Sequence, residues 1–307
     1  MIRTVPAIRL TDVTKRYGDE TALSGLDLEV KQGEIYGFLG PNGAGKSTTI
    51  NLLLDFVRPT SGEVRVFDFD AQSEGLAIRE RTGILPEGFS LYDRLSGRKH
   101  IEFAIESKGV SDDPDALLER VGIPDAAEKK VGGYSKGMTQ RLALAAAIAG
   151  EPDLLILDEP STGLDPAGAR EMREIIRQER DRGATIFFSS HILEQVDAVC
   201  DRVGILRDGE LVAEDSVSGL REATADETTL IVELDRLPKN ATEQVAALDG
   251  VSKVTTQGST ATVSCRDDVK TRVLRAFEDS GATVENFEAE ESSLEDLFIS
   301  YTTGASA

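Results

Sequence analysis

The stretch Gly40-Pro41-Asn42-Gly43-Ala44-Gly45-Lys46-Ser47 decides the fold of this chain. It matches G-x-x-x-x-G-K-[ST] at every fixed position, the pattern of a loop whose backbone N–H groups surround phosphates. Glycines let these N–H groups converge, and the positive end of the following helix favours an anion. Lys46 is expected to reach the terminal phosphates, and the Ser47 hydroxyl to bind Mg²⁺. We therefore predict that residues 40–47, together with Thr48, bind a nucleoside triphosphate.

The segments around this loop supply the context that it needs. Residues 34–39 form a short apolar run before the loop, and a helix is expected from Lys46 onward. Strand, glycine-rich loop and helix in this order are the setting of a phosphate-binding loop. Upstream, residues 7–30 alternate in polarity like strands, and residues 62–69 resemble a hairpin. The sequence therefore predicts a β-rich N-terminal region that leads into the loop.

A second apolar run, residues 154–157, is typical of a strand buried on both faces of a parallel sheet. It is followed by a predicted helix at residues 166–182 and a predicted strand at residues 184–188, so the core is α/β. Two acids, Asp158 and Glu159, end the run. An aspartate at such a strand end can hold Mg²⁺ or its water, and a neighbouring acid can polarise an attacking water. Asp158 is therefore predicted as a metal-side acid and Glu159 as the general base.

Phosphate loops occur in kinases, GTPases, motors and many other ATPases, so a further motif is needed to distinguish among these classes of protein. The signature segment, Tyr134-Ser135-Lys136-Gly137-Met138, precedes the aspartate strand by one helix. It resembles the LSGGQ signature of the ABC ATPase family, with Lys136 in place of the first glycine of the pair. The resemblance implies that Ser135 and Gly137 contact the nucleotide held by the opposite subunit. Lys136 either adds positive charge there or faces solvent.

Other landmarks of the ABC family follow in the family's order. Residues 161–166 follow Glu159 with only Pro160 between, as the dimer-contacting D-loop follows the catalytic acid. His191 matches the switch histidine that touches the γ-phosphate, and Tyr17 stands where the adenine-stacking aromatic does. The resemblance thus implies Lys46, Glu159 and His191 as catalytic residues, with Tyr17, Ser135 and Gly137 added to the nucleotide-binding set.

Two positions are less regular. Glu87 occupies the place of the Q-loop glutamine. It can offer an oxygen to Mg²⁺ or water but has no amide donor, so we expect it on the metal side with reduced coupling chemistry. His100 lies in a charged helical stretch and is expected to be an exposed surface residue.

The resemblance covers residues from about 7 to 220 and implies a P-loop ABC ATPase core with a small N-terminal β-subdomain and a helical subdomain at about residues 88–135. We assign residues 1–221 to this ATPase domain and residues 222–307 to a small α+β accessory module. The module is predicted to end in an amphipathic helix at residues 292–301. Its ending, residues 293–298, resembles the extension of many exporter-type ATPase subunits.

Bulk composition limits the partners and the location. The formal charge is −21, with 11 Lys and 23 Arg against 55 acids, which disfavours direct binding to nucleic acid. We hypothesise a halophilic host whose salty cytoplasm screens this repulsion. The longest apolar stretch, residues 142–148, is too short for a membrane span, and the N-terminus has no apolar signal core. Cys200 and Cys265 are expected to be buried free thiols in a reducing cytosol.

Together these features predict an ATP- and Mg²⁺-dependent subunit of an ABC transporter. It would act as a homodimer, or as a heterodimer with a related ATPase, beneath a separate transmembrane permease on the inner face of the cell membrane. The family resemblance favours export over import. The alternatives are a soluble ABC ATPase acting on ribosomes or DNA, which usually has tandem motif sets or a long coiled-coil insertion, and a small-molecule P-loop kinase, which lacks a signature segment.

Overall fold

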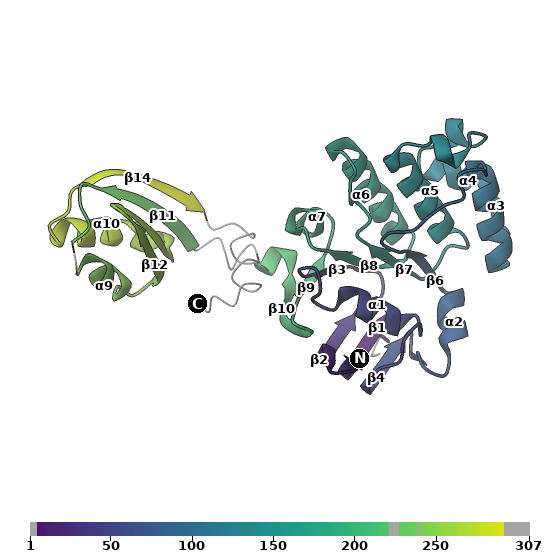
Figure 1. Ribbon diagram of the computed structural model, residues 1–307, viewed down its shortest axis with the longest axis horizontal. Helices are drawn as coiled ribbons and strands as arrows, with labels where there is room; N and C mark the ends of the chain where they lie inside the picture. Colours follow the sequence, from purple (N-terminus) through teal and green to yellow (C-terminus); the bar gives the residue numbers. More distant parts are fainter. Residues whose placement is uncertain (1–4, 221–226, 239, 292–307) are drawn as a thin grey trace. The chain divides into compact units, whose positions relative to one another are not determined.

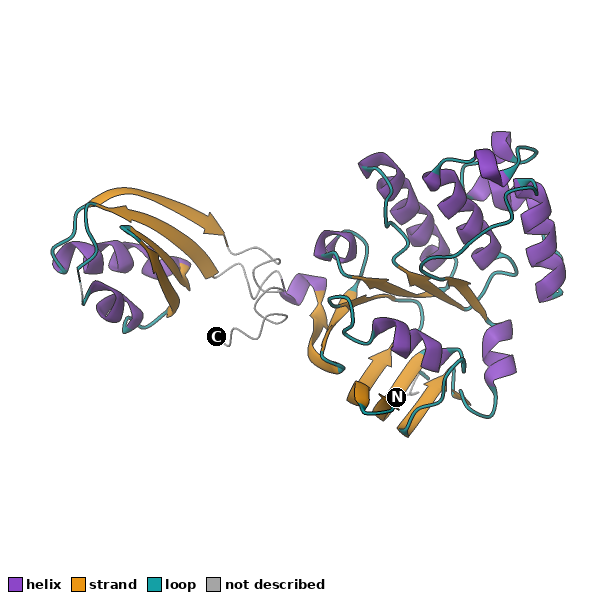
Figure 2. Ribbon diagram, in the orientation of Figure 1, coloured by secondary structure: helices purple, strands orange, loops and turns teal. Residues whose placement is uncertain are grey.

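The computed structural model describes residues 5–220, 227–238 and 240–291. Contacts divide the chain into two compact units between Asp215 and Ser216 (Figures 1 and 2). The expected domain boundary at residues 221 and 222, and the predicted helix at residues 292–301, lie outside the described residues. Each unit has its own hydrophobic core, so the two are described separately.

A four-stranded antiparallel sheet begins the first unit, in the order β2-β1-β4-β5. Its strands are β1 (Ile8–Tyr17), β2 (Glu20–Val30), β4 (Ser61–Val66) and β5 (Phe69–Asp70). Alternating residues such as Leu26 and Leu28 are buried while their neighbours are exposed, as expected for a sheet with one face on the core. The tight turn between β1 and β2 brings Tyr17 opposite Glu20.

A six-stranded sheet forms the centre of the unit, in the order β10-β9-β3-β8-β7-β6. Its strands are β3 (Ile35–Leu39), β6 (Thr82–Leu85), β7 (Leu154–Asp158), β8 (Thr185–Ser190), β9 (Arg202–Arg207) and β10 (Glu210–Ser216). Strands β9, β3, β8, β7 and β6 pair in parallel. Every residue of β3, β7 and β8 is buried, because their apolar runs are covered on both faces. The carboxyl ends of these strands therefore meet at one edge of the sheet.

Helices cover both faces of the central sheet (Figure 1). They are α1 (Lys46–Leu53), α2 (Gly75–Glu80), α3 (Gly97–Lys108), α4 (Pro114–Arg120), α5 (Lys136–Ile148), α6 (Pro166–Asp181) and α7 (Leu193–Asp197). Helix α1 lies on the side of the antiparallel sheet, whereas α3, α4, α5 and α6 lie on the other side. Helices α3, α4 and α5 pack against one another. Arg120 of α4 and Glu179 of α6 form an ion pair in which both side chains are largely buried.

The expectation that His100 is exposed is wrong. His100 is 8% exposed, lies in the first turn of α3, and is held at both ring nitrogens. Nε2 accepts a hydrogen bond from the Tyr92 N–H at 3.0 Å, and Nδ1 lies 2.9 Å from the Ser96 carbonyl oxygen. The charged neighbours that suggested exposure occupy the other face of the helix. His100 therefore joins the preceding loop to α3.

The second unit is an antiparallel sheet with helices packed on it. Its strands are β11 (Glu227–Leu234), β12 (Val251–Gln257), β13 (Thr260–Arg266) and β14 (Val284–Glu291), in the order β12-β13-β11-β14. Its α-helices are α9 (Ala241–Ala246) and α10 (Lys270–Asp279). The core forms between one sheet face and the helices, where Val232, Val263 and Phe277 are fully buried. This arrangement follows from alternation along β11 and β13 and from the apolar face of α10.

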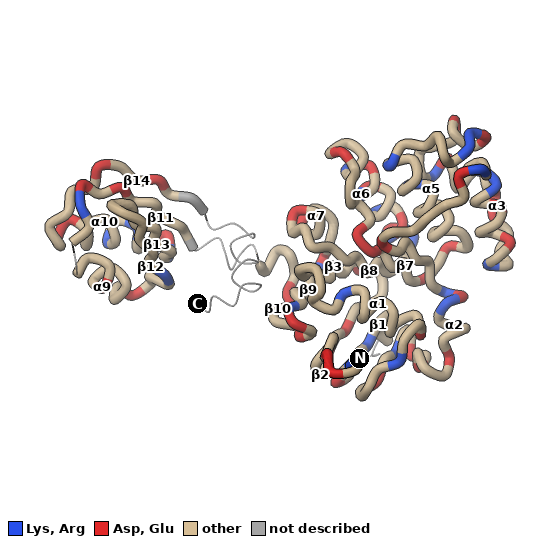
Figure 3. Tube along the Cα trace, viewed as in Figure 1, with Lys and Arg blue, Asp and Glu red and all other residues tan. Residues whose placement is uncertain are grey.

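Two further expectations can be checked on this fold. Cys200 and Cys265 are both buried thiols, as predicted. Within the described ranges, no helix combines the length and the apolar character that a membrane crossing would need. Acidic side chains are spread over both units (Figure 3).

Candidate functional site

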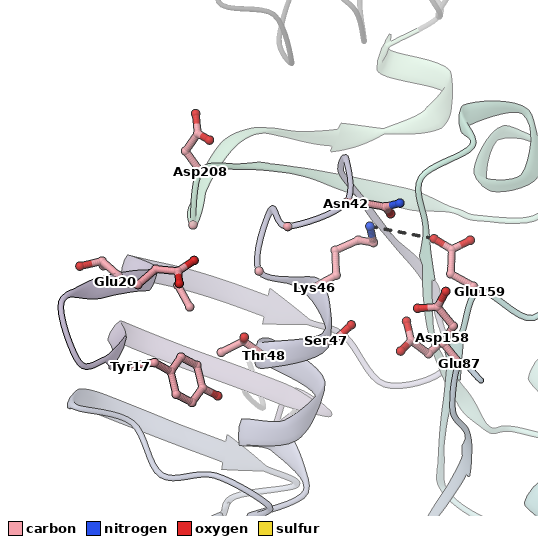
Figure 4. A pocket seen from close by; sticks show the side chains of 15 residues that line it. Tyr17, Glu20, Asn42, Lys46, Ser47, Thr48, Glu87, Asp158, Glu159 and Asp208 are labelled. Atoms are coloured by element: carbon pink, nitrogen blue, oxygen red, sulfur yellow. Dashed lines mark ion pairs between the residues drawn. The ribbon is translucent and has the colours of Figure 1, made fainter. Parts of the chain in front are cut away.

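A cleft of about 670 Å³ opens between the phosphate-binding loop, the β1–β2 turn and the carboxyl end of β7 (Figure 4). It is lined by Tyr17, Glu20, Thr21, Ala22, Asn42, Gly43, Gly45, Lys46, Ser47, Thr48, Glu87, Asp158, Glu159, Asp208 and Gly209. The structure thus gathers ten of the sixteen predicted site residues, although these ten are spread from residue 17 to residue 159 of the sequence.

The loop itself joins β3 to α1 and requires glycine for two different reasons. Gly45 has φ 114°, a left-handed conformation, and a Cβ there would lie 2.7 Å from both the Ala22 carbonyl oxygen and a Leu23 methyl group. At Gly40 a Cβ would lie 2.5 Å from the Leu206 carbonyl oxygen. The loop is therefore packed closely against its neighbours and leads into the N-terminus of α1, where an anion is favoured.

Lys46 is the cation of this loop, and its side chain is only 7% exposed. Its ammonium donates to the carbonyl oxygens of Gly40 at 2.6 Å and Pro41 at 3.3 Å, and lies 4.0 Å from Oε1 of Glu159. Burial lowers the pKa of Lys46, while the nearby acids act in the opposite direction. The loop thus holds a desolvated positive charge next to the place where phosphate is expected.

Glu159 lies at the carboxyl end of β7 in a strained conformation, with φ 50° and an exposed fraction of 4%. Its Oε1 is 2.7 Å from Nδ1 of His191, while its Oε2 accepts hydrogen bonds from Thr162 at 3.3 Å and Ser190 at 3.4 Å. The His191 side chain is 41% exposed, so it can bridge the buried carboxylate and the solvent side. Glu159 and His191, predicted separately from the sequence, are therefore direct partners.

Asp158 is the second acid of this edge and is 7% exposed. Burial raises the pKa of its carboxyl group, and a hydrogen bond from the Ser189 hydroxyl opposes this effect. The Glu87 N–H also donates to it. Ser189 was not predicted from the sequence, because its position beside Asp158 depends on the pairing of β7 with β8.

The predicted metal ligands Ser47, Asp158 and Glu87 all line the cleft and offer only oxygen atoms. Oxygen is the donor that Mg²⁺ prefers, so their chemistry fits this ion. In the described part of the chain no group of three or more His, Cys, Asp or Glu residues is placed to hold a metal. Mg²⁺ is usually held by one or two carboxylates together with substrate phosphates and water, and Asp158 and Glu87 could supply such carboxylates.

The far end of the cleft is formed by the β1–β2 turn and by the turn between β9 and β10. Tyr17 is 46% exposed, and the Lys15 ammonium lies 4.7 Å from the centre of its ring. Glu20 and Asp208 add two carboxylates that sequence reasoning missed (Figure 4). The Asp208-Gly209 pair is a turn signal, but nothing in the sequence indicates that this turn reaches the cleft.

Six predicted residues are not among those that line the cleft: Gly40, Pro41 and Ala44 belong to the phosphate-binding loop, His191 contacts Glu159, and Ser135 and Gly137 lie in the signature segment. Ser135 caps α5, accepting a hydrogen bond from the Met138 N–H at 3.2 Å, and its side chain is exposed. Figure 1 shows α5 among the helices on the side of the sheet opposite α1. The Ser135 end of the signature segment is thus exposed and does not line the cleft of its own chain.

Both units match known protein families. The family described as ABC transporter matches residues 23–162, and the family described as ATP-binding protein DrrA1-3-like, C-terminal domain, matches residues 216–302. The daunorubicin resistance ATP-binding protein DrrA3 of Streptomyces coeruleorubidus is 34% identical over 302 residues, 96% of each chain. The bacitracin transport ATP-binding protein BcrA of Bacillus licheniformis is 43% identical over 67% of this chain and 69% of that protein. A fluoroquinolones export ATP-binding protein of Mycobacterium tuberculosis is 42% identical over 70% and 73%.

Solved structures resemble the first unit. An ATP-binding subunit of an ABC transporter has a TM-score of 0.64 and 28% identity, covering 71% of this chain and 92% of that one. A dimeric ATP-binding cassette in a post-hydrolysis state, bound to ADP and Pi, has a TM-score of 0.62 and 25% identity, covering 68% and 98%.

Proposed function

We propose that this chain powers export through a separate membrane permease, because it belongs to the family of ABC transporter ATP-binding proteins. As a member of that family the chain is an ATPase with the α/β fold of ABC cassettes, so the predicted family, fold class and activity are confirmed. The direction of transport is supported by relatives named for drug resistance, bacitracin transport and fluoroquinolone export. The match of residues 216–302 to the DrrA-like domain agrees with this.

The contact between Glu159 and His191 beside Lys46 is the observation that carries the proposed chemistry. ATP binds with its phosphates against residues 40–47 and its base toward Tyr17. Glu159 accepts a proton from the attacking water, and His191 orients that carboxylate. Lys46 moves from the loop carbonyls to the terminal phosphate and stabilises the negative charge that develops there.

A bound Mg²⁺ would neutralise phosphate charge during this reaction. Ser47, Asp158 and Glu87 would hold it or its water. The buried Asp158 carboxylate is kept in place by Ser189 and by the Glu87 N–H, so it is oriented before any ligand binds.

The active form is proposed to be a dimer, in which Ser135 and Gly137 of one copy complete the site of the other. The exposed position of Ser135 supports this, since it leaves the signature segment outside its own cleft. A similar solved cassette is dimeric with ADP and Pi bound. Whether the second copy is identical or a related ATPase does not alter this geometry.

The charged helical region from Glu87 to Gly133 is proposed to dock cytoplasmic helices of the permease, which would hold the chain at the inner face of the cell membrane. Two large apolar side chains support this assignment, because Tyr92 is 71% exposed and Phe103 63% exposed. For residues 222–307 we propose a role in stabilising the dimer or regulating it. The halophilic origin stays a hypothesis based on the charge of −21.

Purification of the tagged chain from detergent-solubilised native membranes at high salt tests the transporter proposal. We expect a multi-spanning membrane protein to copurify and to be identified by mass. Ribosomal or DNA-associated partners, with no membrane protein in any preparation, would instead support the soluble ATPase alternative.

A further inference from the structure

Lys136 stands at the tip of the signature segment and is the first residue of α5. Its side chain is exposed, and within the described ranges it forms no ion pair or hydrogen bond. Exposed lysines elsewhere in the described ranges, such as Lys99 and Lys253, also form no ion pair, so it is its position in the signature segment that distinguishes Lys136. A free cation is therefore kept beside the residues that we propose to meet nucleotide.

The D-loop determines where this cation lies. A Cβ at Gly163 would lie 1.8 Å from Nζ of Lys136, 2.6 Å from Cε and 3.0 Å from Cδ. The ammonium end of Lys136 thus lies against the bare backbone of Gly163, which has φ 73°. Beside it, a Cβ at Gly137 would lie 3.7 Å from a Leu164 methyl group. The signature segment and the D-loop of one chain therefore form a single surface.

No acid of the D-loop neutralises Lys136. Asp165, which ends the loop, accepts a hydrogen bond from the Gly168 N–H at 2.7 Å and so caps α6. Glu159, which precedes the loop, is held by His191, Thr162 and Ser190. Both carboxylates are committed elsewhere, so the ammonium is available for an external anion.

We propose that Lys136 is a further nucleotide-contacting residue, donating to a terminal phosphate oxygen of the ATP held by the other copy, and that Gly163 is the residue that positions it. This inference rests on the proposed dimer. The Ser135 hydroxyl and the N-terminus of α5 would then be joined by a full positive charge on the same phosphate. The lysine would thereby supply an attraction that a glycine at this place cannot.

The test compares two equilibria in the Glu159→Gln background. ATP binding to the dilute monomer reports the chain's own loop, and ATP-driven dimerisation reports contacts made across the pair. Lys136→Met is expected to weaken dimerisation with ATP by about 10-fold or more, as for loss of a charge-assisted hydrogen bond. Affinity of the monomer for ATP stays the same, because Lys136 does not line its own cleft.

Two further variants separate a phosphate contact from a merely structural role. Lys136→Arg keeps the charge and should restore most of the dimerisation, whereas Lys99→Met removes an exposed lysine of α3 and should have no effect. The deficit of Lys136→Met should also shrink at molar salt, where charge attraction is screened.

Gly163 is tested by a double-mutant cycle. Gly163→Ala would displace the lysine and also strain the loop, so weaker dimerisation of this variant alone would not show which of the two effects is responsible. If Gly163 acts through Lys136, Gly163→Ala should weaken ATP-driven dimerisation less in the Lys136→Met variant than in the parent. Full additivity would overturn the positioning role.

The outcomes distinguish this inference from the proposed function. Full-strength dimerisation of Lys136→Met, or a loss that Arg does not restore, would overturn the phosphate contact while leaving the dimer intact. If the Glu159→Gln parent forms no ATP-driven dimer, the dimeric mechanism fails and the inference fails with it.

Discussion

The two units of this chain are both mixed α and β structures, and the cleft that gathers the predicted site residues is formed by the first. In the first, parallel strands buried on both faces end at one edge, and Asp158 and Glu159 lie there at the end of β7. In the second, an antiparallel sheet packs helices on one face, and its fully buried residues are apolar or, like Thr228, hydrogen-bonded. Parallel strands gather their carboxyl ends and so create a site, whereas antiparallel strands distribute their ends to both edges.

The largest expected effect is chemical and confined to the first unit. Glu159→Gln removes the proposed base while keeping its shape, so the turnover rate for ATP should fall about 100- to 10,000-fold. ATP affinity should change little, because the phosphate loop is intact. Steady-state hydrolysis and equilibrium binding would measure the two quantities. Glu285→Gln, an exposed acid of β14, is the matched control, and equal losses in both variants would remove Glu159 from the role of base.

The second prediction concerns the stability of the hydrophobic core of the second unit. Phe277 of α10 is fully buried in the core of the second unit, so Phe277→Ala should lower that unit's free energy of unfolding by about 3–5 kcal/mol. Phe287→Ala removes the same side chain from a position that is 53% exposed and should cost under about 0.5 kcal/mol.

Denaturant titration followed by circular dichroism, alongside ATP binding, would measure this effect. If the units are energetically independent, the Phe277→Ala chain loses its second-unit transition early but binds ATP as before. Loss of ATP binding in that variant would contradict the separation of the two cores.

Sequence reasoning found the part of the site that is local. Residues 40–47 and the pair Asp158 and Glu159 form contiguous motifs whose strand and loop contexts are visible in the sequence. The contact of Lys136 with Gly163, and the approach of Asp208 to the cleft, depend on tertiary packing that no local pattern encodes. His100 was misjudged for the same reason, since charged neighbours on one helix face say nothing of what packs on the other.

The third prediction concerns the ion pair between Arg120 of α4 and Glu179 of α6, with 11% and 3% side-chain exposure. Arg120→Leu leaves the buried carboxylate without a partner, so it should cost about 3–5 kcal/mol in the free energy of unfolding of the first unit. Replacing both residues with leucine should restore much of this loss. The double-mutant cycle gives the coupling energy between the two residues. If the single and the double variant lose the same free energy of unfolding, the buried unpaired carboxylate is not the cause of the loss.

The same pair predicts a pH dependence. Burial raises the pKa of Glu179 in the folded protein, and the hydrogen bond from Arg120 opposes this effect. A raised pKa favours folding at low pH, and this contribution is lost as pH rises from the unfolded value of about 4.3 through the folded value. Removal of Arg120 should raise the folded pKa further, so Arg120→Leu should destabilise more at pH 7.5 than at pH 5.5. Urea titrations at the two pH values would measure the difference.

The smallest expected effect is the response of each unit's melting midpoint to salt, which depends on how densely the unit is charged. The second unit, Ser216–Ala307, holds 17 acids and 8 bases, a net −9, while the much longer first unit holds −12. Raising salt from 0.1 to 1 M shortens the screening length from about 10 to 3 Å, which relieves repulsion most where charge is dense. Each kcal/mol gained should raise the melting midpoint by about 4–8 °C in the smaller unit, against about 2–4 °C in the larger. Calorimetry in KCl should therefore show the second unit responding more strongly.

A charge-reduced variant shows whether repulsion is the cause of this response. Glu285→Gln combined with Glu288→Gln removes two exposed acids from β14 and should weaken the salt response of the second unit alone. A salt response that is equal in both units, or unchanged in this variant, would point to general salt effects on burial instead. The hypothesis of a salty cytoplasm makes the stronger claim that the whole chain depends on such screening. Full folding and activity in low salt, equal to those at molar salt, would refute it.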